Sequence, residues 1–157
     1  MHLFFYYFCT LTMYFFSNMK LFLLDAYALI YRSFYAFAKN PRINSKGLNT
    51  SPIYGFVNTL NEVLASQQPT HIAVCFDPSG PTFRHQMYVE YKAQREETPE
   101  AIRVAIPLIK QVLEAMNISV IQVDGYEADD VIGTLAYKAS AMGIDVYMMT
   151  PDKDYGQ

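Results

Sequence analysis

Acidic residues in this sequence gather where predicted strands end. Of the 15 Asp and Glu residues, seven follow four short apolar runs. Because the carboxyl ends of parallel strands lie at one edge of a sheet, we expect these carboxylates to converge there. Neighbouring carboxylates repel one another, and Mg²⁺ or Mn²⁺, which prefer oxygen ligands, commonly hold such clusters together. The seven candidate metal ligands are Asp25, Asp77, Glu127, Asp129, Asp130, Asp152 and Asp154.

A simpler explanation for any single acid is that it caps a helix or a turn. Acids are favoured in the first turn of a helix, which suits Asp25 and one acid of the Glu127-x-Asp129-Asp130 group. This explanation accounts poorly for all seven acids together. On a helix, Glu127 and Asp130 share a face while Asp129 points about 100° away from Asp130. In an extended segment, residues 152 and 154 project to the same side.

Basic residues are also clustered. Four of them, and no acid, lie between residues 26 and 61, namely Arg32, Lys39, Arg42 and Lys46. Between residues 78 and 95, Arg84, Lys92 and Arg95 are interleaved with Phe83, Tyr88 and Tyr91. Such mixtures suit phosphate contact and base stacking, although solvated loops with exposed charged tips are the alternative for each residue. Together with an acidic metal centre they indicate metal-dependent phosphodiester hydrolysis.

Composition excludes several other classes. The chain has 157 residues, 52% hydrophobic and 17% charged, which excludes a disordered tail, a coiled coil and a collagen-like fibre. Its net charge of −3 gives no indication of nucleic acid, so a polyanion site must come from local clustering. The two cysteines, Cys9 and Cys75, exclude a disulfide scaffold and a four-cysteine zinc site, and favour a reducing compartment.

The elements that must position these groups alternate between strand and helix. Apolar runs predict strands over 20–25, 70–77, 118–123 and 144–149. Helices are predicted over 26–38, 51–67, 98–116, with a kink or restart at Pro107, and 126–142; residues 39–49 and 78–97 are left irregular. The strands lack period-two alternation, so both of their faces should be covered. The pattern predicts an α/β domain with a mostly parallel central sheet and helices on both faces.

The first 18 residues differ from the remainder. Residues 3–16 are apolar apart from Thr10 and Thr12, and strongly aromatic. The run is shorter than the roughly 20 residues that cross a bilayer, and it lacks the clear features of a secretory signal. Met19 directly precedes a predicted strand. We therefore expect residues 1–18 to be an extension outside the fold, such as a mis-chosen start would leave, with a membrane-facing anchor as the alternative.

Five sequence blocks occur in an order that resembles a known family. They are LFLLDAYALIYRSFYAF, AVCFDPSGPTFRH, YKAQREETPEAI, GYEADDVIGTLA and TPDKDYGQ. They are similar to the flap-endonuclease-like 5′-nuclease family, which has a PIN-like core and includes the 5′–3′ exonuclease domain of bacterial DNA polymerase I. The resemblance covers residues 19–157, and residues 1–18 have no counterpart in it.

The resemblance implies roles for particular residues. The seven acids match the carboxylates around two metal ions. Lys92 and Arg95 match a basic pair that contacts the scissile phosphate, and on a helix they would share a face. Tyr31, Arg32 and Arg84 resemble part of a gateway that receives the 5′ end. Residues 78–97 resemble the start of a helical arch through which a single-stranded 5′ flap passes.

The resemblance also implies a function. The expected activity is metal-dependent hydrolysis of DNA and RNA primers in replication and repair, in the cytoplasm at the nucleoid. The expected substrates are DNA with 5′ flaps, nicks or ends, and RNA–DNA primer junctions, with a polymerase domain in cis and no membrane partner. The family has two further aspartates and a helix–three-turn–helix element beyond the last residue of this chain. We therefore expect residues 19–157 to be a C-terminally truncated domain that is weak or inactive alone.

Two alternatives stay open. One is a PIN-type ribonuclease, which uses a similar group of acids; activity on flap DNA compared with unstructured RNA separates it from a flap nuclease. The other is a non-catalytic nucleic-acid-binding module. Cleavage that is lost with EDTA would exclude that module.

Overall fold

Four parallel strands form the centre of the molecule. The computed structural model describes residues 19–88, 90–94 and 97–151. Its strands are β1 (Lys20–Asp25), β2 (His71–Phe76), β3 (Ser119–Gln122) and β4 (Asp145–Met149). The strand order is β3-β2-β1-β4, and every neighbouring pair is parallel. The predicted parallel sheet is confirmed.

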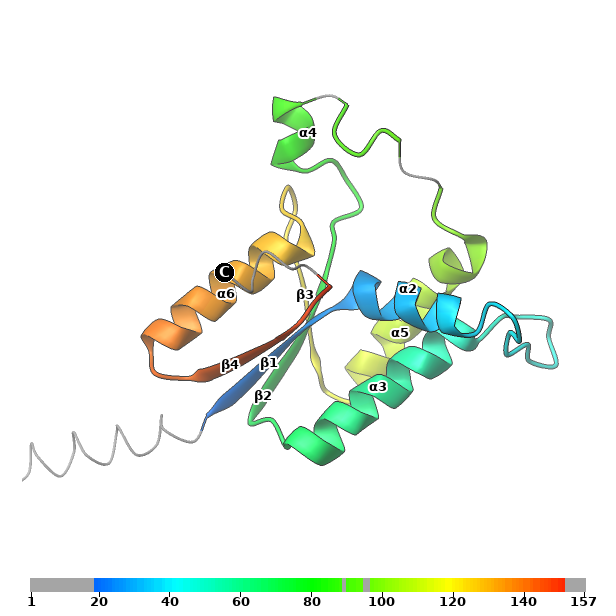
Figure 1. The fold of residues 1–157 in the computed structure, drawn as a ribbon, viewed down its shortest axis with the longest axis horizontal. Coiled ribbons are helices and arrows are strands. Elements are labelled where there is room, and N and C mark those ends of the chain that lie inside the picture. Colours follow the sequence, from blue (N-terminus) through cyan, green and yellow to red (C-terminus); the bar gives the residue numbers. More distant parts are fainter. Residues whose placement is uncertain (1–18, 89, 95–96, 152–157) are drawn as a thin grey trace, which may run out of the picture.

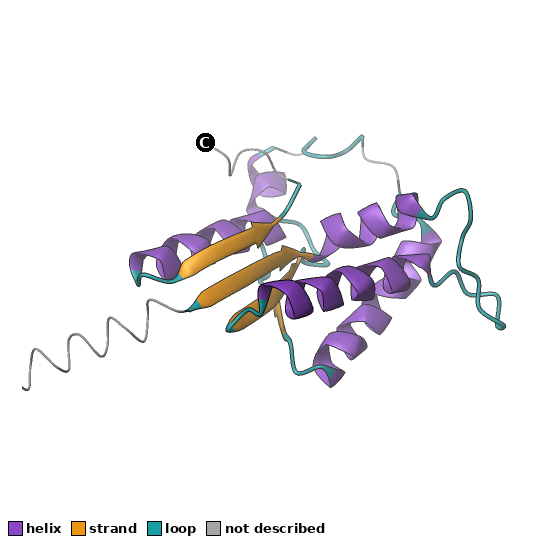
Figure 2. Cartoon of the chain, turned by 60° about the horizontal axis from the view of Figure 1, so that its bottom comes forward, coloured by secondary structure: helices purple, strands orange, loops and turns teal. Residues whose placement is uncertain are grey.

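Helices cover both faces of this sheet (Figures 1 and 2). One face carries α2 (Ala26–Ala36), α3 (Ser51–Gln67) and α5 (Glu100–Ala115), and the other carries α6 (Ala128–Ala141). A short helix, α4 (Phe83–Met87), stands beyond the carboxyl ends of the strands, and from there the chain passes across to the start of α5 (Figure 1). The α/β class with helices on both faces is as predicted.

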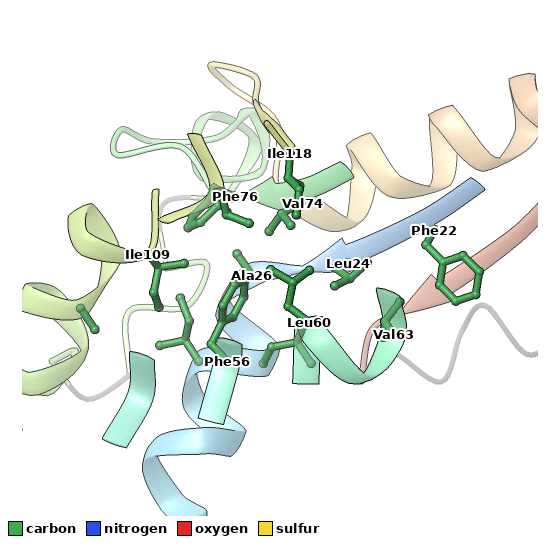
Figure 3. Close-up of a cluster of buried hydrophobic side chains, with 14 of the residues drawn as sticks. Phe22, Leu24, Ala26, Phe56, Leu60, Val63, Val74, Phe76, Ile109 and Ile118 are labelled. Atoms are coloured by element: carbon green, nitrogen blue, oxygen red, sulfur yellow. The ribbon is translucent and has the colours of Figure 1, made fainter. Parts of the chain in front are cut away.

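The two central strands are buried on both sides because their side chains alternate between two apolar clusters. Phe22 and Leu24 of β1 pack with Phe56 and Leu60 of α3 in the larger cluster (Figure 3). Leu23 points the other way and packs against α6. Successive side chains of a strand point to opposite faces, so a strand between two helical layers needs a continuous apolar run.

The edge strands differ from this pattern. Val120 of β3 and Tyr147 and Met148 of β4 are exposed at 38%, 43% and 37%. The expectation that every strand is covered on both faces is therefore wrong for β3 and β4, because the helical layers leave side chains of these edge strands exposed. Among the described residues, no helix is both long and apolar enough to cross a membrane.

Two details of the helices also depart from expectation. Helix α5 continues through Pro107 without a restart, and its buried side chains, Ile102, Ala105, Ile109 and Leu113, lie along one face. Packing of that face against the core offsets the local cost of proline. Residues 78–97, predicted to be irregular, contain α4.

The connection from β3 to β4 makes a topological switch point between β1 and β4. The chain adds β2 and then β3 to one side of β1, and then returns to place β4 on the other side. At such a switch point the connections leave the carboxyl ends of two neighbouring strands in opposite directions, which opens a space for ligands. Asp25 ends β1 at this point, and Thr150 follows β4.

Candidate metal centre and its basic rim

Two aspartates at the carboxyl edge of the sheet act electrostatically on a third, Asp25. Asp25 is the last residue of β1, Asp77 follows β2, and Asp129 is in the first turn of α6. Asp25 is 8% exposed. Burial, and then the negative charges of Asp129 and Asp77, raise the pKa of Asp25 from 3.8 to about 6. The three carboxylates therefore form a centre of concentrated negative charge.

Backbone amides and a hydroxyl hold these aspartates in place. Asp25 Oδ1 accepts a hydrogen bond from the N–H of Ala28 at 3.0 Å and so caps α2, as its sequence position predicted. Asp77 Oδ1 accepts from the N–H of Ala128 at 2.7 Å, which ties the end of β2 to the start of α6. The Thr150 hydroxyl donates to Asp129 Oδ1 at 3.4 Å. Helix capping therefore explains in part why acids occur at these positions. Their interaction with one another is the other part of the explanation.

A divalent cation fits the chemistry of this centre. All of its donors are carboxylate oxygens, which Mg²⁺ and Mn²⁺ prefer, and a cation would favour the ionised form of Asp25, whose pKa is raised by burial and then by the charges of Asp129 and Asp77. Within the described residues, no three Asp, Glu, His or Cys side chains are grouped closely enough to hold a metal ion. Asp152 and Asp154, also predicted as ligands, lie outside the described residues.

Glu127 has a different environment from the three aspartates. It is buried at the start of α6, and its Oε1 lies 2.7 Å from Lys92 Nζ. The Tyr91 hydroxyl donates to Glu127 Oε2 at 3.2 Å. A protein cation therefore neutralises this acid.

Asp130 is neutralised as well. Its two oxygens accept from Arg84 Nη1 and Nη2 at 2.6 and 2.7 Å. The Arg84 hydrogen bonds hold the pKa of Asp130 below its usual range. Arg84 Nη1 also lies 3.7 Å from Glu127 Oε2, so Glu127 and Asp130 share one face of α6, as their spacing predicted. Asp129 interacts with Asp25 instead, as its different direction on the helix implied.

The pairing of Lys92 with Arg95 stays a prediction. Residues 90–94 form turns, closed by hydrogen bonds from Tyr91 N–H to Tyr88 O and from Ala93 N–H to Glu90 O. Lys92 has a φ of 59°, in the left-handed region, so the helical geometry in which the two residues would share a face is not present at Lys92. Arg95 lies outside the described residues.

The three residues predicted to form a gateway have three different environments. The Tyr31 hydroxyl donates to Thr98 Oγ1 at 3.2 Å, close to the start of α5. Arg32 Nη2 donates to Thr59 Oγ1 of α3 at 3.0 Å. Arg84 binds Asp130 on the other side of the sheet. The gateway stays a prediction.

Sequence reasoning missed several residues that complete the site. Tyr91 contacts Glu127, and its position directly before Lys92 was the available signal. Thr150 contacts Asp129 and follows β4 in the way that Asp77 follows β2. Tyr27 lies in the first turn of α2; burial, and then the charge of Asp77, raise the pKa of its phenol.

A parallel sheet with an acidic centre at its carboxyl edge, next to a basic and aromatic segment, defines a PIN-like 5′-nuclease fold. Residues 20–157 match the family described as 5′-3′ exonuclease, N-terminal resolvase-like domain, and the chain belongs to this family. The resemblance inferred from the five sequence blocks is therefore confirmed.

Curated relatives are longer than this chain. It is 46% identical over 134 residues to the DNA polymerase I of Treponema pallidum (strain Nichols), covering 85% of this chain and 13% of that protein. It is 42% identical over 134 residues to a 5′-3′ exonuclease of Aquifex aeolicus (strain VF5), covering 85% of this chain and 46% of the relative.

Solved structures of similar fold come from a bacteriophage. The T5 5′-exonuclease with bound divalent metal ions (zinc) aligns with a TM-score of 0.60 at 20% identity, over 87% of this chain and 51% of that one. The T5 D15 flap endonuclease, in a complex with DNA and metal ions, aligns with a TM-score of 0.59 at 19% identity, over 87% of this chain and 50% of the other. At these identities the likeness concerns the fold.

Proposed function

We propose that this chain carries the metal centre of a 5′–3′ exonuclease and structure-specific 5′ nuclease that hydrolyses phosphodiester bonds in DNA and in RNA primers. The observation that carries the proposal is the centre formed by Asp25, Asp77 and Asp129, in which burial and neighbouring charge raise the pKa of Asp25 to about 6. Membership of the exonuclease family and the Aquifex aeolicus relative named as a 5′-3′ exonuclease support the same reaction.

The three aspartates are the residues we expect to hold Mg²⁺ or Mn²⁺, with Glu127 beside them and Asp152 and Asp154 as further predicted ligands. Two ions are expected in an intact domain. The chemistry that such ions supply is activation of a water molecule and stabilisation of the leaving oxygen. Asp25 and Asp77 are each held by a backbone amide, that of Ala28 and that of Ala128.

Lys92 supplies positive charge for the substrate. Its ammonium group lies 2.7 Å from Glu127 Oε1, and its side chain is 26% exposed. A phosphate that enters the site can exchange with Glu127 as the partner of this ammonium. Lys92 then offsets the charge that develops on the phosphoryl oxygens in the transition state. Arg95 has the same expected role, and Tyr31 and Arg32 are the expected contacts of the 5′ end.

The proposed substrates are DNA with 5′ flaps, nicks or ends, and RNA–DNA primer junctions. Products would carry 5′-phosphate and 3′-hydroxyl groups. Two relatives support this choice by their descriptions, one as a DNA polymerase I and the other as a flap endonuclease bound to DNA. A polymerase domain in the same polypeptide and a location in the cytoplasm at the nucleoid belong to the same proposal.

Cleavage assays with the full-length gene product test this function. End-labelled 5′-flap DNA and unstructured RNA are incubated with Mg²⁺ or with EDTA. We expect flap DNA to be cut near its junction and all cleavage to stop with EDTA. Asp129→Ala should abolish cleavage while flap binding survives. Asp145→Asn, an exposed acid at the opposite end of β4, is the matched control and should cut normally.

Two outcomes would overturn the proposal. Preferential cutting of unstructured RNA would identify a PIN-type ribonuclease. Binding of flap DNA without cleavage, in Mg²⁺ and in Mn²⁺, would identify a binding module.

A further inference from the structure

The short helix α4 is held without help from the hydrophobic core. It has five residues, and none of its side chains is buried. Its first residue instead docks on the turn that precedes α6, where Phe83 N–H donates to Gly125 O at 2.9 Å and the rings of Phe83 and Tyr126 lie 5.6 Å apart. The position of α4 therefore depends on a few contacts with residues 125–130.

The Arg84–Asp130 pair is the strongest of these contacts. The two planar groups meet through two parallel hydrogen bonds of 2.6 and 2.7 Å, a geometry that fixes orientation as well as distance. The guanidinium carbon of Arg84 also lies 4.6 Å from the centroid of the Phe83 ring. Arg84 is thus held between its own helix and α6.

The carboxylate of Asp130 has little capacity left for another ligand. Besides the two bonds from Arg84, Asp130 Oδ2 accepts from the N–H of Glu127 at 3.0 Å. Its charge is neutralised, and its pKa is lowered by the Arg84 hydrogen bonds. Asp25 shows the reverse, with a pKa raised by burial and by other carboxylates.

Residues 91 and 92, which follow α4 in the chain, contact the same turn at the start of α6. Tyr91 and Lys92 both contact Glu127, while Arg84 lies near Glu127 as well as Asp130. Residues 83–84 and 91–92 are therefore joined through two acids that are one helical turn apart. If the ion pair between Arg84 and Asp130 is broken, the placement of Lys92 beside Glu127 loses a support.

We propose that Asp130 is a positioning residue and not a metal ligand: its ion pair with Arg84 fixes residues 83–88 and 90–92 so that Lys92 lies beside Glu127 at the start of α6. This departs from the assignment of Asp130 to metal binding and of Arg84 to the 5′ end that the sequence led us to expect. The expected loss of cleavage rate rests on the proposed nuclease function. The expected changes in metal affinity and amide hydrogen exchange can be measured without that function.

Three variants of the full-length protein separate the two roles of Asp130. Asp130→Asn removes the charge but keeps an oxygen for the Glu127 amide, Arg84→Gln removes the other partner, and Asp129→Asn is the reference for the loss of a metal ligand. Mn²⁺ affinity is measured by calorimetry without substrate. Amide hydrogen exchange is followed over residues 83–92. Circular dichroism verifies that each variant is folded.

We expect Asp130→Asn and Arg84→Gln to keep Mn²⁺ affinity within about twofold, while Asp129→Asn lowers it by about tenfold or more. Both pair variants should speed exchange in residues 83–92 to the same extent, and the double variant should add nothing, because both changes remove one interaction. Single-turnover flap cleavage should fall on the order of 10²-fold through misplacement of Lys92. Arg84→Lys keeps the positive charge but cannot form two parallel hydrogen bonds with Asp130. Its exchange and cleavage rates should lie between those of wild type and Arg84→Gln.

Either of two results overturns the inference. If Asp130→Asn weakens Mn²⁺ binding as much as Asp129→Asn does, Asp130 is a metal ligand. If Arg84→Gln leaves exchange in residues 83–92 unchanged, the pair does not position the segment. A wild-type protein that fails to cut flap DNA would count against the proposed function, while the affinity and exchange measurements would still decide the role of Asp130.

Discussion

Asp129 and Asp130 are neighbours in the sequence, yet their carboxylates are in opposite electrostatic surroundings. Asp129 acts, as Asp77 does, on the carboxylate of Asp25, in a region where negative charge accumulates. Asp130 is neutralised by Arg84, and Glu127, on the same helical face, is neutralised by Lys92. The start of α6 therefore contributes acids to two different regions of the molecule. Asp25, Asp77 and Asp129 are the proposed metal ligands, while Glu127 and Asp130 contact Lys92 and Arg84 of the neighbouring segment.

Removing an acid of the first region should cause the largest loss of activity and should increase the stability of the fold. Asp25→Asn should reduce flap cleavage below detection, because a carboxylate at the proposed metal centre is lost. Asparagine caps helices as well as aspartate does, so α2 keeps its cap. Rates with Mg²⁺ and unfolding curves with EDTA are measured on the same preparation.

The stability change should depend on pH in a defined direction. The pKa of Asp25 is raised from 3.8 to about 6 on folding, so its contribution to stability is greatest below pH 4 and is lost as the pH rises to about 6. At pH 7 with EDTA, Asp25→Asn should therefore be more stable than wild type by up to about 3 kcal/mol. At pH 4 the difference should fall to about 0.5 kcal/mol, because the carboxyl is still partly ionised in the unfolded chain. A gain of the same size at both pH values would show that ionisation is not its cause.

Lys92 tests the second region, where the expected effect is smaller. Lys92→Ala should lower the single-turnover rate on the order of 10²-fold at saturating enzyme, because one donor to the developing charge is lost. Flap affinity should change little. Lys138→Ala, an exposed lysine on α6 far along from its acidic turn, is the control. Weaker binding with an unchanged rate would place Lys92 among residues that contact the DNA backbone.

Gly55 tests the scaffold that supports both regions. A Cβ added there would lie 2.6 Å from Cβ and Oγ of Ser33, so α2 and α3 would have to move apart. Gly55→Ala should cost about 1–3 kcal/mol in the free energy of unfolding, as overpacking of a core does. Gly80→Ala, where nothing lies within 4 Å, is the control. Urea unfolding measures both variants; equal stabilities would mean that the contact between α2 and α3 is easily relaxed.

The smallest effect is expected from the N-terminal residues. If residues 1–18 are outside the fold, a chain that begins at Met19 should melt at the same temperature as the longer chain and be more soluble. Differential scanning calorimetry and sedimentation measure both properties. A shortened chain that fails to fold would contradict this domain assignment.

Sequence patterns predicted the structure correctly where a residue type occurs at a position for a single physical reason. Leu23 and Leu24 indicate a strand that is covered on both faces, and both are fully buried. The spacing of Glu127 and Asp130 predicted that they lie together, and they do so as the N-cap and third residue of a capping box at the start of α6. Gly143, with a φ of 78°, follows α6, as the glycine signal predicted.

Long-range pairing was beyond the reach of the sequence. No local pattern specifies that Arg84 meets Asp130, 46 residues away, or that β4 lies beside β1. The left-handed backbone of Lys92 was missed because lysine carries no preference for that conformation. Tyr147 was expected to be buried, but strand position decides burial, and that position depends on the crossover from β3 to β4.

The crossover that places β4 beside β1 has a consequence for how the chain folds. Strands β1, β2 and β3 pair in the order in which they are synthesised, whereas Lys20 can pair with Asp145 only after nearly the whole described chain is available. Contacts of such large sequence separation form late, because the entropy of closing the loop must be overcome first. Thr150 reaches Asp129 through that last strand. During refolding, native secondary structure should therefore appear before tight Mn²⁺ binding, and the acids are brought fully together only when the hydrophobic core is already there to oppose their repulsion.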